Sequence, residues 1–389
     1  MERVAIVGAS MTPFGTREGE WLRDLLTAAG AACLDDAGVE SDRIDHLYVS
    51  NMASGELEGQ TGVPNMLAQD LAATPAYTAR IDQTSSSGGA GIYAAWQSIA
   101  SGASETTLLV GGEKMTHRTT GDATDVIASL THPVEYKHGV TLPSFAGLTA
   151  RLYLDEYDAP RDSLGKVAVK NHRNGVDNPN AQFQKEVDLE TVLDSPIVAD
   201  PLRLYDFCPI TDGSAALLFC PESIAREITD EYVVVSGVAG ATDTHVVHER
   251  PDPTTMRGVV ESSQAAYEMA DRSPEDIDVA ELHDMFTILE FLQFEGLGFA
   301  EKGEGWKSVE EGRTERDGDI PINTSGGLKS KGHPLGASGV AQAVEIVEQL
   351  TDEAGDRQLP DPEVGLACNV GGFGNCVTTT ILERPEAGQ

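Results

Sequence analysis

Three polar residues stand at points where an α/β protein commonly places reactive groups, beside the ends of buried strands and the starts of small-residue helices. Ser85 begins the run Ser85–Gly89, which precedes a segment rich in glycine and alanine. His283 directly follows a short apolar segment, and His333 precedes a second small-residue segment. At a helix start, free backbone N–H groups would stabilise an anion that develops on a serine, and a histidine could act as its base. These residue types are therefore compatible with nucleophilic catalysis.

Each of these residues also has a structural alternative. Ser85, Ser86 and Ser87 could serve as helix caps, because serine is a common N-cap residue. The chain has nine histidines, and spacing alone does not separate His283 and His333 from the rest. No HExxH motif accompanies them and the five cysteines contain no CxxC pair, so no metal site is expected. Walker A and GxGxxG patterns are also absent from the sequence.

The elements that must position these residues follow an alternating pattern. Short apolar segments alternate with alanine-rich helical ones, which predicts an α/β fold with a largely buried sheet. The order of strand, reactive polar residue, small-residue helix, strand and Gly-Gly occurs twice, about 250 residues apart, which indicates an internal duplication. Strands are predicted at 4–7, 47–49, 106–110, 215–219, 232–235, 280–282 and 364–367, and helices over 22–37, from the Ser85–Gly89 run to about 100, and over 337–350.

The charge is strongly negative. Asp and Glu number 63 against 27 Lys and Arg, so the formal net charge is -36. This field disfavours nucleic acid and anionic membranes as partners. Acidic excess with few lysines suggests a cytoplasm of very high ionic strength, with an acidic mesophilic protein as the alternative. The sequence shows neither a signal peptide nor an apolar segment long enough to span a bilayer, so a cytoplasmic location is expected.

Taken together, six blocks of the sequence resemble the thiolase family, in particular its archaeal and sterol-carrier-like branch. The resemblance covers nearly the whole chain, and the block around His333 is the most specific of the six. The blocks are Ile81–Gly89, Asn178–Ala181, Tyr205–Ala216, His283–Asp284, Asn323–Gly327 with Gly332–Gly339, and Asn369–Gly374.

The resemblance implies a thiolase fold with two duplicated α/β halves, each with a mixed sheet, in five layers of α-β-α-β-α. The first half would comprise residues 1–115 and 208–230, and the second half residues 231–389. Residues 116–207 would form an inserted loop domain that contacts coenzyme A.

The resemblance also implies the roles of the site residues. Ser85 would hold the acyl group, His333 would deprotonate it, and His283 would help to stabilise an enolate. Backbone N–H groups of Ser85 and of Gly371–Gly374 would serve the tetrahedral intermediate. The family's nucleophile is a cysteine, however, and a serine hydroxyl is far less ionised at neutral pH and would form an ester rather than a thioester.

Three interpretations of the serine stay open: a working enzyme, a slow one, or a relative without chemistry. The expected function is thus an acyl-CoA C-acyltransferase (a β-ketothiolase), with a non-catalytic acyl-CoA or lipid-binding protein as the alternative. Met285 stands where this branch often has an acid/base cysteine, and Cys368 is a candidate to replace it.

The resemblance further implies CoA thioester substrates without a permanently bound cofactor. It implies a homodimer or homotetramer, and a small OB-fold partner of the DUF35 type. The region 116–207 offers few clustered cations for the CoA phosphates, the nearest group being Lys166, Lys170 and Arg173. The chain also ends at Gln389 without an appended domain, so we expect a partner to complete the CoA site.

Overall fold

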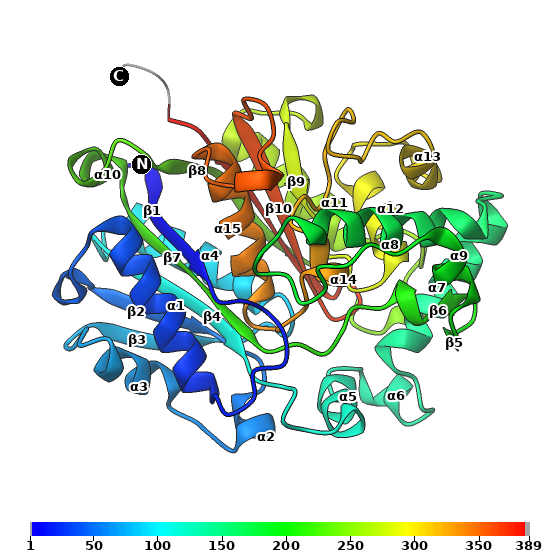
Figure 1. Cartoon of the computed structure of the whole chain (residues 1–389), viewed down its shortest axis with the longest axis horizontal. Coiled ribbons are helices and arrows are strands. Elements are labelled where there is room, and N and C mark those ends of the chain that lie inside the picture. Colours follow the sequence, from blue (N-terminus) through cyan, green and yellow to red (C-terminus); the bar gives the residue numbers. More distant parts are fainter. Residues whose placement is uncertain (1, 386–389) are drawn as a thin grey trace.

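Within residues 2–385, which the computed structural model describes, nine strands pair into one sheet in the order β3-β2-β4-β7-β1-β8-β11-β10-β9 (Figure 1). Most of these strands are buried along their length, as the apolar segments predict. The strands are β1 (Val4–Met11), β2 (His46–Ser50), β3 (Tyr77–Ile81), β4 (Thr107–Glu113), β7 (Gly213–Pro221), β8 (Val233–Thr242), β9 (Val279–Glu281), β10 (Val364–Gly371) and β11 (Cys376–Glu383).

The sheet shows the duplication directly. From the centre outward, β1-β7-β4-β2 in one half matches β8-β11-β10-β9 in the other. In each half, two antiparallel pairs are followed by one parallel pair. The two halves are joined where β1 pairs antiparallel with β8, with Val4 opposite Val235. The predicted half-sheets are therefore both present and mixed, and backbone hydrogen bonds make them continuous.

Helices complete a five-layered arrangement. Helices α4 (Ser87–Ala100) and α15 (Ser338–Leu350) contact strands of both halves and each other, so they form the middle layer. Helices α1 (Leu22–Ala37) and α3 (Val63–Asp70) cover the outer side of the first half, and α11 (Arg257–Ala270) covers β8 and β11. The thiolase-like α-β-α-β-α fold expected from the sequence is confirmed.

The region between β4 and β7 is helical and lies along one side of the molecule (Figure 1). It contains α5 (Thr120–Ala128), α6 (Pro133–Tyr136), α7 (Leu142–Glu156), α8 (Arg161–Val176), α9 (Leu189–Asp194) and the small hairpin of β5 (Ile197–Ala199) and β6 (Leu202–Arg203). Its helices α7 and α8 pack mainly on α12 (Thr287–Gly296), α13 (Gly305–Glu310) and α14 (Gly327–Ser330) of the second half.

Two strands of the sheet were not predicted. Strand β3 is an edge strand whose side chains are half-buried or exposed, so it has no apolar signature. Strand β11 is buried but contains the three threonines Thr378–Thr380, so it lacks the continuous apolar run by which a central strand is predicted. Outside the inserted region, the sequence also did not predict the helices α2 (Ser54–Glu58), α3, α10 (Glu222–Ile228), α11, α12, α13 and α14.

Two features are absent from the described residues. Between residues 2 and 385, no helix combines the length and the apolar character that crossing a bilayer requires. In the same part of the chain, no group of three or more His, Cys, Asp or Glu side chains is arranged to hold a metal ion.

Candidate active site

The three residues selected from the sequence meet in one buried site. Ser85 precedes α4, His283 follows β9, and His333 precedes α15. All three are buried, with 2%, 0% and 5% of their surfaces exposed. The imidazole rings of His283 and His333 lie edge to face with centroids 4.8 Å apart. Residues separated by almost 250 positions therefore share one site because both halves of the duplicated fold contribute to it.

A glycine contact between the two middle helices makes this convergence possible. A Cβ placed on Gly339 of α15 would lie 2.2 Å from Oδ1 of Asn369 and 2.6 Å from the backbone nitrogen of Gly89 in α4. These distances are shorter than any normal van der Waals contact. The first turns of the two helices, and with them Ser85 and His333, can approach because residue 339 has no side chain.

The backbone adopts a positive φ at the residue before Ser85 and at the residue before His333. Thr84 has a φ of 54°, which is unusual for a β-branched residue, and it directly precedes Ser85. Gly332 has a φ of 115° and directly precedes His333. Such conformations persist only where the surroundings hold them in place, and they concentrate at functional sites.

The three consecutive serines differ in what their hydroxyls do. Ser86 donates to the carbonyl oxygen of Asn369 (3.1 Å). Ser87 donates to the carbonyl oxygen of Thr84 (2.5 Å) and accepts from the backbone of Gln83 (2.9 Å). The Ser85 hydroxyl makes no hydrogen bond within the described residues. The hydroxyls of Ser86 and Ser87 are thus engaged, and the hydroxyl of Ser85 is left without a hydrogen bond in that part of the chain.

The hydrogen bonds of His333 determine which of its ring nitrogens carries the proton. Ser338 donates its hydroxyl hydrogen to the carbonyl oxygen of Pro334 (2.9 Å), so its oxygen must accept from Nδ1 of His333 (2.7 Å). The proton therefore lies on Nδ1. Nε2 keeps its lone pair, is buried, and has no partner among the described residues. His333 presents the nitrogen of a base.

His283 has the opposite arrangement, which Asn369 imposes. Gly89 donates its backbone N–H to Oδ1 of Asn369 (2.9 Å), which identifies the other end of that amide as Nδ2. Nδ2 donates to the carbonyl oxygen of Ser85 (3.3 Å) and to Nδ1 of His283 (3.0 Å). Since Nδ1 accepts, the proton of His283 is on Nε2, which is also buried and without a partner in the described chain. His283 presents a hydrogen-bond donor.

Burial keeps both imidazoles neutral. It lowers the pKa of His333 to about 3. Burial, with the neighbouring His333, holds the pKa of His283 well below its usual value. One neutral acceptor and one neutral donor, side by side, form the pair needed to remove a proton and to stabilise an oxyanion.

The loop that carries His283 is held from two sides. Gln293 accepts from the His283 backbone N–H (2.9 Å) and donates to its carbonyl oxygen (3.0 Å). The Asp284 carboxyl accepts from the backbone of Leu328 (2.6 Å) and from Nδ2 of Asn171 (2.6 Å). Burial raises the pKa of Asp284 to about 7. These bonds position His283 against the segment that leads to His333.

The glycine segment that begins at the end of β10 adjoins the loop that carries Ser85. A Cβ on Gly371 would lie 2.7 Å from Oγ1 of Thr84 and 2.9 Å from the carbonyl oxygen of Gln83. This places the start of the expected Gly371–Gly374 segment directly beside the loop that carries Ser85.

Neither Met285 nor Cys368 is placed to act as an acid or base in this site. Met285 is buried two residues after His283, in an apolar cluster, and offers no proton. Cys368 lies on β10 beside Asn369, but neighbouring residues of a strand face opposite sides, and its thiol packs in the cluster of Val259 and Tyr267. Burial raises the pKa of Cys368 to about 12. The structure thus directs Asn369 into the site and Cys368 away from it.

Asn369 is the residue of this candidate site that the sequence did not single out. Asn369 begins the block Asn369–Gly374. The sequence instead indicated Cys368, the residue directly before it, because a thiol can act as an acid or base. The alternation of β10 decides between them, and its register could not be fixed from the sequence alone.

Family models match both parts of the chain. "Thiolase, N-terminal domain" matches residues 4–223, and "Thiolase C-terminal domain-like" matches residues 239–384. The acetyl-CoA acetyltransferase of Methanothermobacter thermautotrophicus is 43% identical over 385 residues, covering 99% of this chain and 100% of that protein. Human sterol carrier protein 2 is 32% identical, covering 100% of this chain and 73% of that protein.

The fold also matches solved structures. The structure described as "Ltp2-ChsH2(DUF35) aldolase" superposes with a TM-score of 0.87 at 23% identity, covering 99% of this chain and 98% of that one. An acetyl-CoA acetyltransferase from Syntrophomonas wolfei superposes with a TM-score of 0.76 at 17% identity, covering 98% and 99%. At these identities the likeness concerns the fold alone.

Proposed function

Because this chain belongs to the thiolase family of acyltransferases, we propose that it catalyses the reversible Claisen condensation of short acyl-CoA thioesters, such as acetyl-CoA, through an acyl-serine on Ser85. The observation that carries the proposal is the opposite protonation of two adjacent histidines beside an unbonded serine hydroxyl. An arrangement that only stabilised the fold would have no need for both Nε2 atoms to be buried without partners.

In the first step, Nε2 of His333 accepts the Ser85 hydroxyl proton as the oxygen attacks the thioester carbon. The bond from that carbon to sulfur breaks, and coenzyme A leaves as the thiol with the proton that His333 held. Burial of the site excludes bulk water from the ester intermediate, which limits hydrolysis.

In the second step, a second acyl-CoA loses a proton from its α-carbon to Nε2 of His333. The resulting enolate oxygen receives a hydrogen bond from Nε2–H of His283. The α-carbon then attacks the acyl-ester carbon, a carbon–carbon bond forms, and the bond to the serine oxygen breaks. His333 returns its proton to Ser85, and the product is a 3-ketoacyl-CoA.

The direct test is covalent trapping. Mixing the protein with acetyl-CoA should add one acetyl group to the peptide that contains Ser85, detected by mass spectrometry. Ser85→Ala should lose the adduct and nearly all turnover, whereas Ser85→Cys should keep or raise turnover because a thiol is the stronger nucleophile. Ser101→Ala, at an exposed serine beyond the end of α4, is the matched control and should change neither.

The alternative is an acyl-CoA or lipid-binding protein without chemistry. It would be favoured if the unmodified protein formed no adduct and no product while binding acyl-CoA as tightly as Ser85→Ala. An unchanged turnover rate in Ser85→Ala would reject the acyl-serine mechanism.

The assembly that we propose is a homo-oligomer working with a small OB-fold partner of the DUF35 type. The structural relative with a TM-score of 0.87 is described as a complex with such a protein. The three cations that come nearest to a group in the inserted region are already engaged, since Lys166 pairs with Glu310, Lys170 with Glu290, and Arg173 with Glu315. Gel filtration with activity assays tests this: full specific activity in a peak that contains this chain alone would reject the need for a partner.

A further inference from the structure

Lys329, a buried lysine without a carboxylate partner among the described residues, lies four residues before His333 and is not one of the proposed catalytic residues. Lys114, Lys170, Lys329 and Lys331 are all buried. Three of them pair with a carboxylate, at 2.5 Å to Asp212, 2.8 Å to Glu290 and 3.3 Å to Glu281. The ammonium group of Lys329 has neither an ion pair nor a hydrogen bond within the described residues, although only 3% of the residue is exposed.

This exception is not caused by a shortage of acids, because the chain has 63 carboxylate side chains for 27 cationic ones. The nearby carboxyl of Asp206 binds Arg161 (2.7 Å) and Thr287 (2.8 Å), and that of Asp284 binds backbone and amide N–H groups. Burying a charge without a partner is costly, so an ammonium group left this way indicates that its partner comes from outside the chain.

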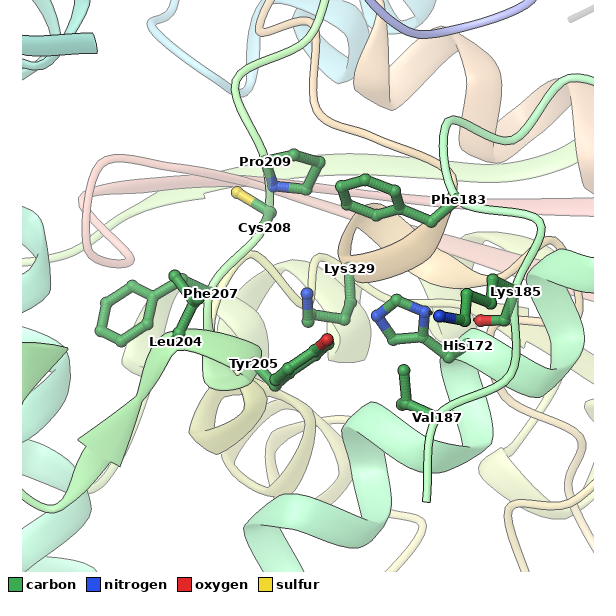
Figure 2. A pocket seen from close by; sticks show the side chains of 10 residues that line it. All are labelled: His172, Phe183, Lys185, Val187, Leu204, Tyr205, Phe207, Cys208, Pro209 and Lys329. Atoms are coloured by element: carbon green, nitrogen blue, oxygen red, sulfur yellow. Dashed lines mark hydrogen bonds between the residues drawn. The ribbon is translucent and has the colours of Figure 1, made fainter. Parts of the chain in front are cut away.

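The lysine opens into a defined cavity. Lys329 is one of the residues lining a cavity of about 300 Å³, whose walls are mostly apolar and aromatic (Figure 2). Its nitrogen lies 5.9 Å from the ring centre of Phe183 and 5.5 Å from that of Tyr205. Leu204, Phe207 and Pro209 add apolar surface. None of the proposed catalytic residues lines this cavity.

The charge of the cavity defines what it can accept. Nδ1 of His172 lies 3.0 Å from the carbonyl oxygen of Lys185 and must donate to it, so Nε2 carries no proton when the ring is neutral. Burial, with the nearby Lys329, lowers the pKa of His172 to about 4. Lys185 is exposed to solvent at the rim. The buried wall therefore carries one positive charge, which matches a monoanion better than a phosphate dianion.

We propose that this cavity is a binding site for a small free monocarboxylate with an apolar body of aryl or branched-chain size. The carboxylate binds the ammonium group of Lys329, and the apolar body packs on Phe183, Leu204 and Pro209. A buried charge-assisted bond supplies the orientation and the apolar walls supply the area, which is the usual division in small-molecule sites. The site does not depend on the proposed acyl transfer.

Equilibrium dialysis with radiolabelled benzoate, at one fixed KCl concentration, tests the proposal. We expect saturable binding of close to one benzoate per chain. Benzyl alcohol, which has the same ring without the charge, should bind at least about tenfold more weakly. Inorganic phosphate should not displace benzoate.

Two variants complete the test. Lys329→Met should bind benzoate at least about tenfold more weakly. Lys137→Met, the same change at an exposed lysine outside the cavity, should bind it like the unmodified protein. No saturable benzoate binding, equal binding of benzyl alcohol by the unmodified protein, or equal binding by folded Lys329→Met would each overturn the proposal. The benzyl alcohol comparison needs no variant, so it decides the question even where Lys329→Met does not fold.

Discussion

At the scale of single residues, the two site histidines differ in which ring nitrogen holds the proton. His333 is set as an acceptor by Ser338, and His283 is set as a donor by Asn369. A neutral imidazole can only accept at one nitrogen and donate at the other. In the proposed mechanism, two adjacent histidines with opposite tautomers therefore divide proton removal and oxyanion stabilisation between them.

This division predicts separable losses. His333→Ala should block acylation of Ser85, because the hydroxyl loses its base. His283→Ala should leave acylation close to normal and impair condensation, because the enolate loses its donor. Losses of roughly 10²- to 10⁴-fold are expected for such groups. Rapid-quench measurement of the acetyl adduct, beside steady-state condensation, separates the steps, and normal acylation by His333→Ala would refute its role.

His333 should also contribute to the pH dependence of stability. Burial lowers its pKa from 6.5 to about 3, so the unfolded chain takes up a proton below pH 6.5 that the folded protein does not. The free energy of unfolding must therefore fall as the pH drops through this range. Between pH 7 and pH 5 this one group accounts for a loss of about 2 kcal/mol.

Denaturant unfolding at the two pH values checks this contribution. His333→Gln should lose about 2 kcal/mol less than the unmodified protein between pH 7 and pH 5, because glutamine does not titrate. His138→Gln, at an exposed histidine, should follow the unmodified protein. Equal pH dependence of His333→Gln and the unmodified protein would show that the ring is not held neutral by the fold.

At the scale of elements, the close contact between α4 and α15 brings together the loops that carry Ser85 and His333. The contact depends on Gly339, because a methyl group there would overlap both Asn369 and the backbone of Gly89. Any separation of these helices would move Ser85 from His333 and would also disturb the amide that orients His283.

Gly339→Ala should therefore destabilise the protein by roughly 1–3 kcal/mol, as overpacked cores do, and reduce turnover at least about tenfold. Gly121→Ala is a matched control, since Gly121 is likewise the second residue of a helix, α5, but its added methyl group would meet nothing closer than 3.8 Å. That control should be neutral or stabilising by up to about 1 kcal/mol. Thermal unfolding and turnover of both variants provide the comparison, and a fully active Gly339→Ala would contradict the argument.

At the scale of the whole molecule, the negative charge is concentrated outside the core. Buried lysines such as Lys114 and Lys170 are neutralised by carboxylates, so the net charge of -36 rests largely on solvated side chains. Repulsion among such side chains is screened over about 10 Å at 0.1 M salt and over about 3 Å at 1 M.

We therefore predict that the melting temperature and the activity rise with KCl from below about 0.1 M to above about 1 M. Scanning calorimetry and activity assays across this range would measure the effect. A protein equally stable in dilute buffer and in molar KCl would contradict the interpretation of its composition as an adaptation to high ionic strength.

The sequence by itself determined the fold class and selected three candidate site residues. The apolar periods marked most of the buried strands, and the motifs around Ser85, His283 and His333 were distinctive because they resemble blocks of the thiolase family. These signals are local, since they lie within a few consecutive residues. The strands that it missed, β3 and β11, lack such a signal because one is exposed at an edge and the other buries threonines.

Only the tertiary structure decided how the site works. The tautomers depend on hydrogen bonds between residues far apart in the chain, such as that of Asn369 with His283 across 86 positions. The choice of Asn369 over Cys368 depends on which face of β10 meets α4, and the isolation of Lys329 depends on where every nearby carboxylate is already bound. Such facts are set by packing between elements, which no local pattern in the sequence encodes.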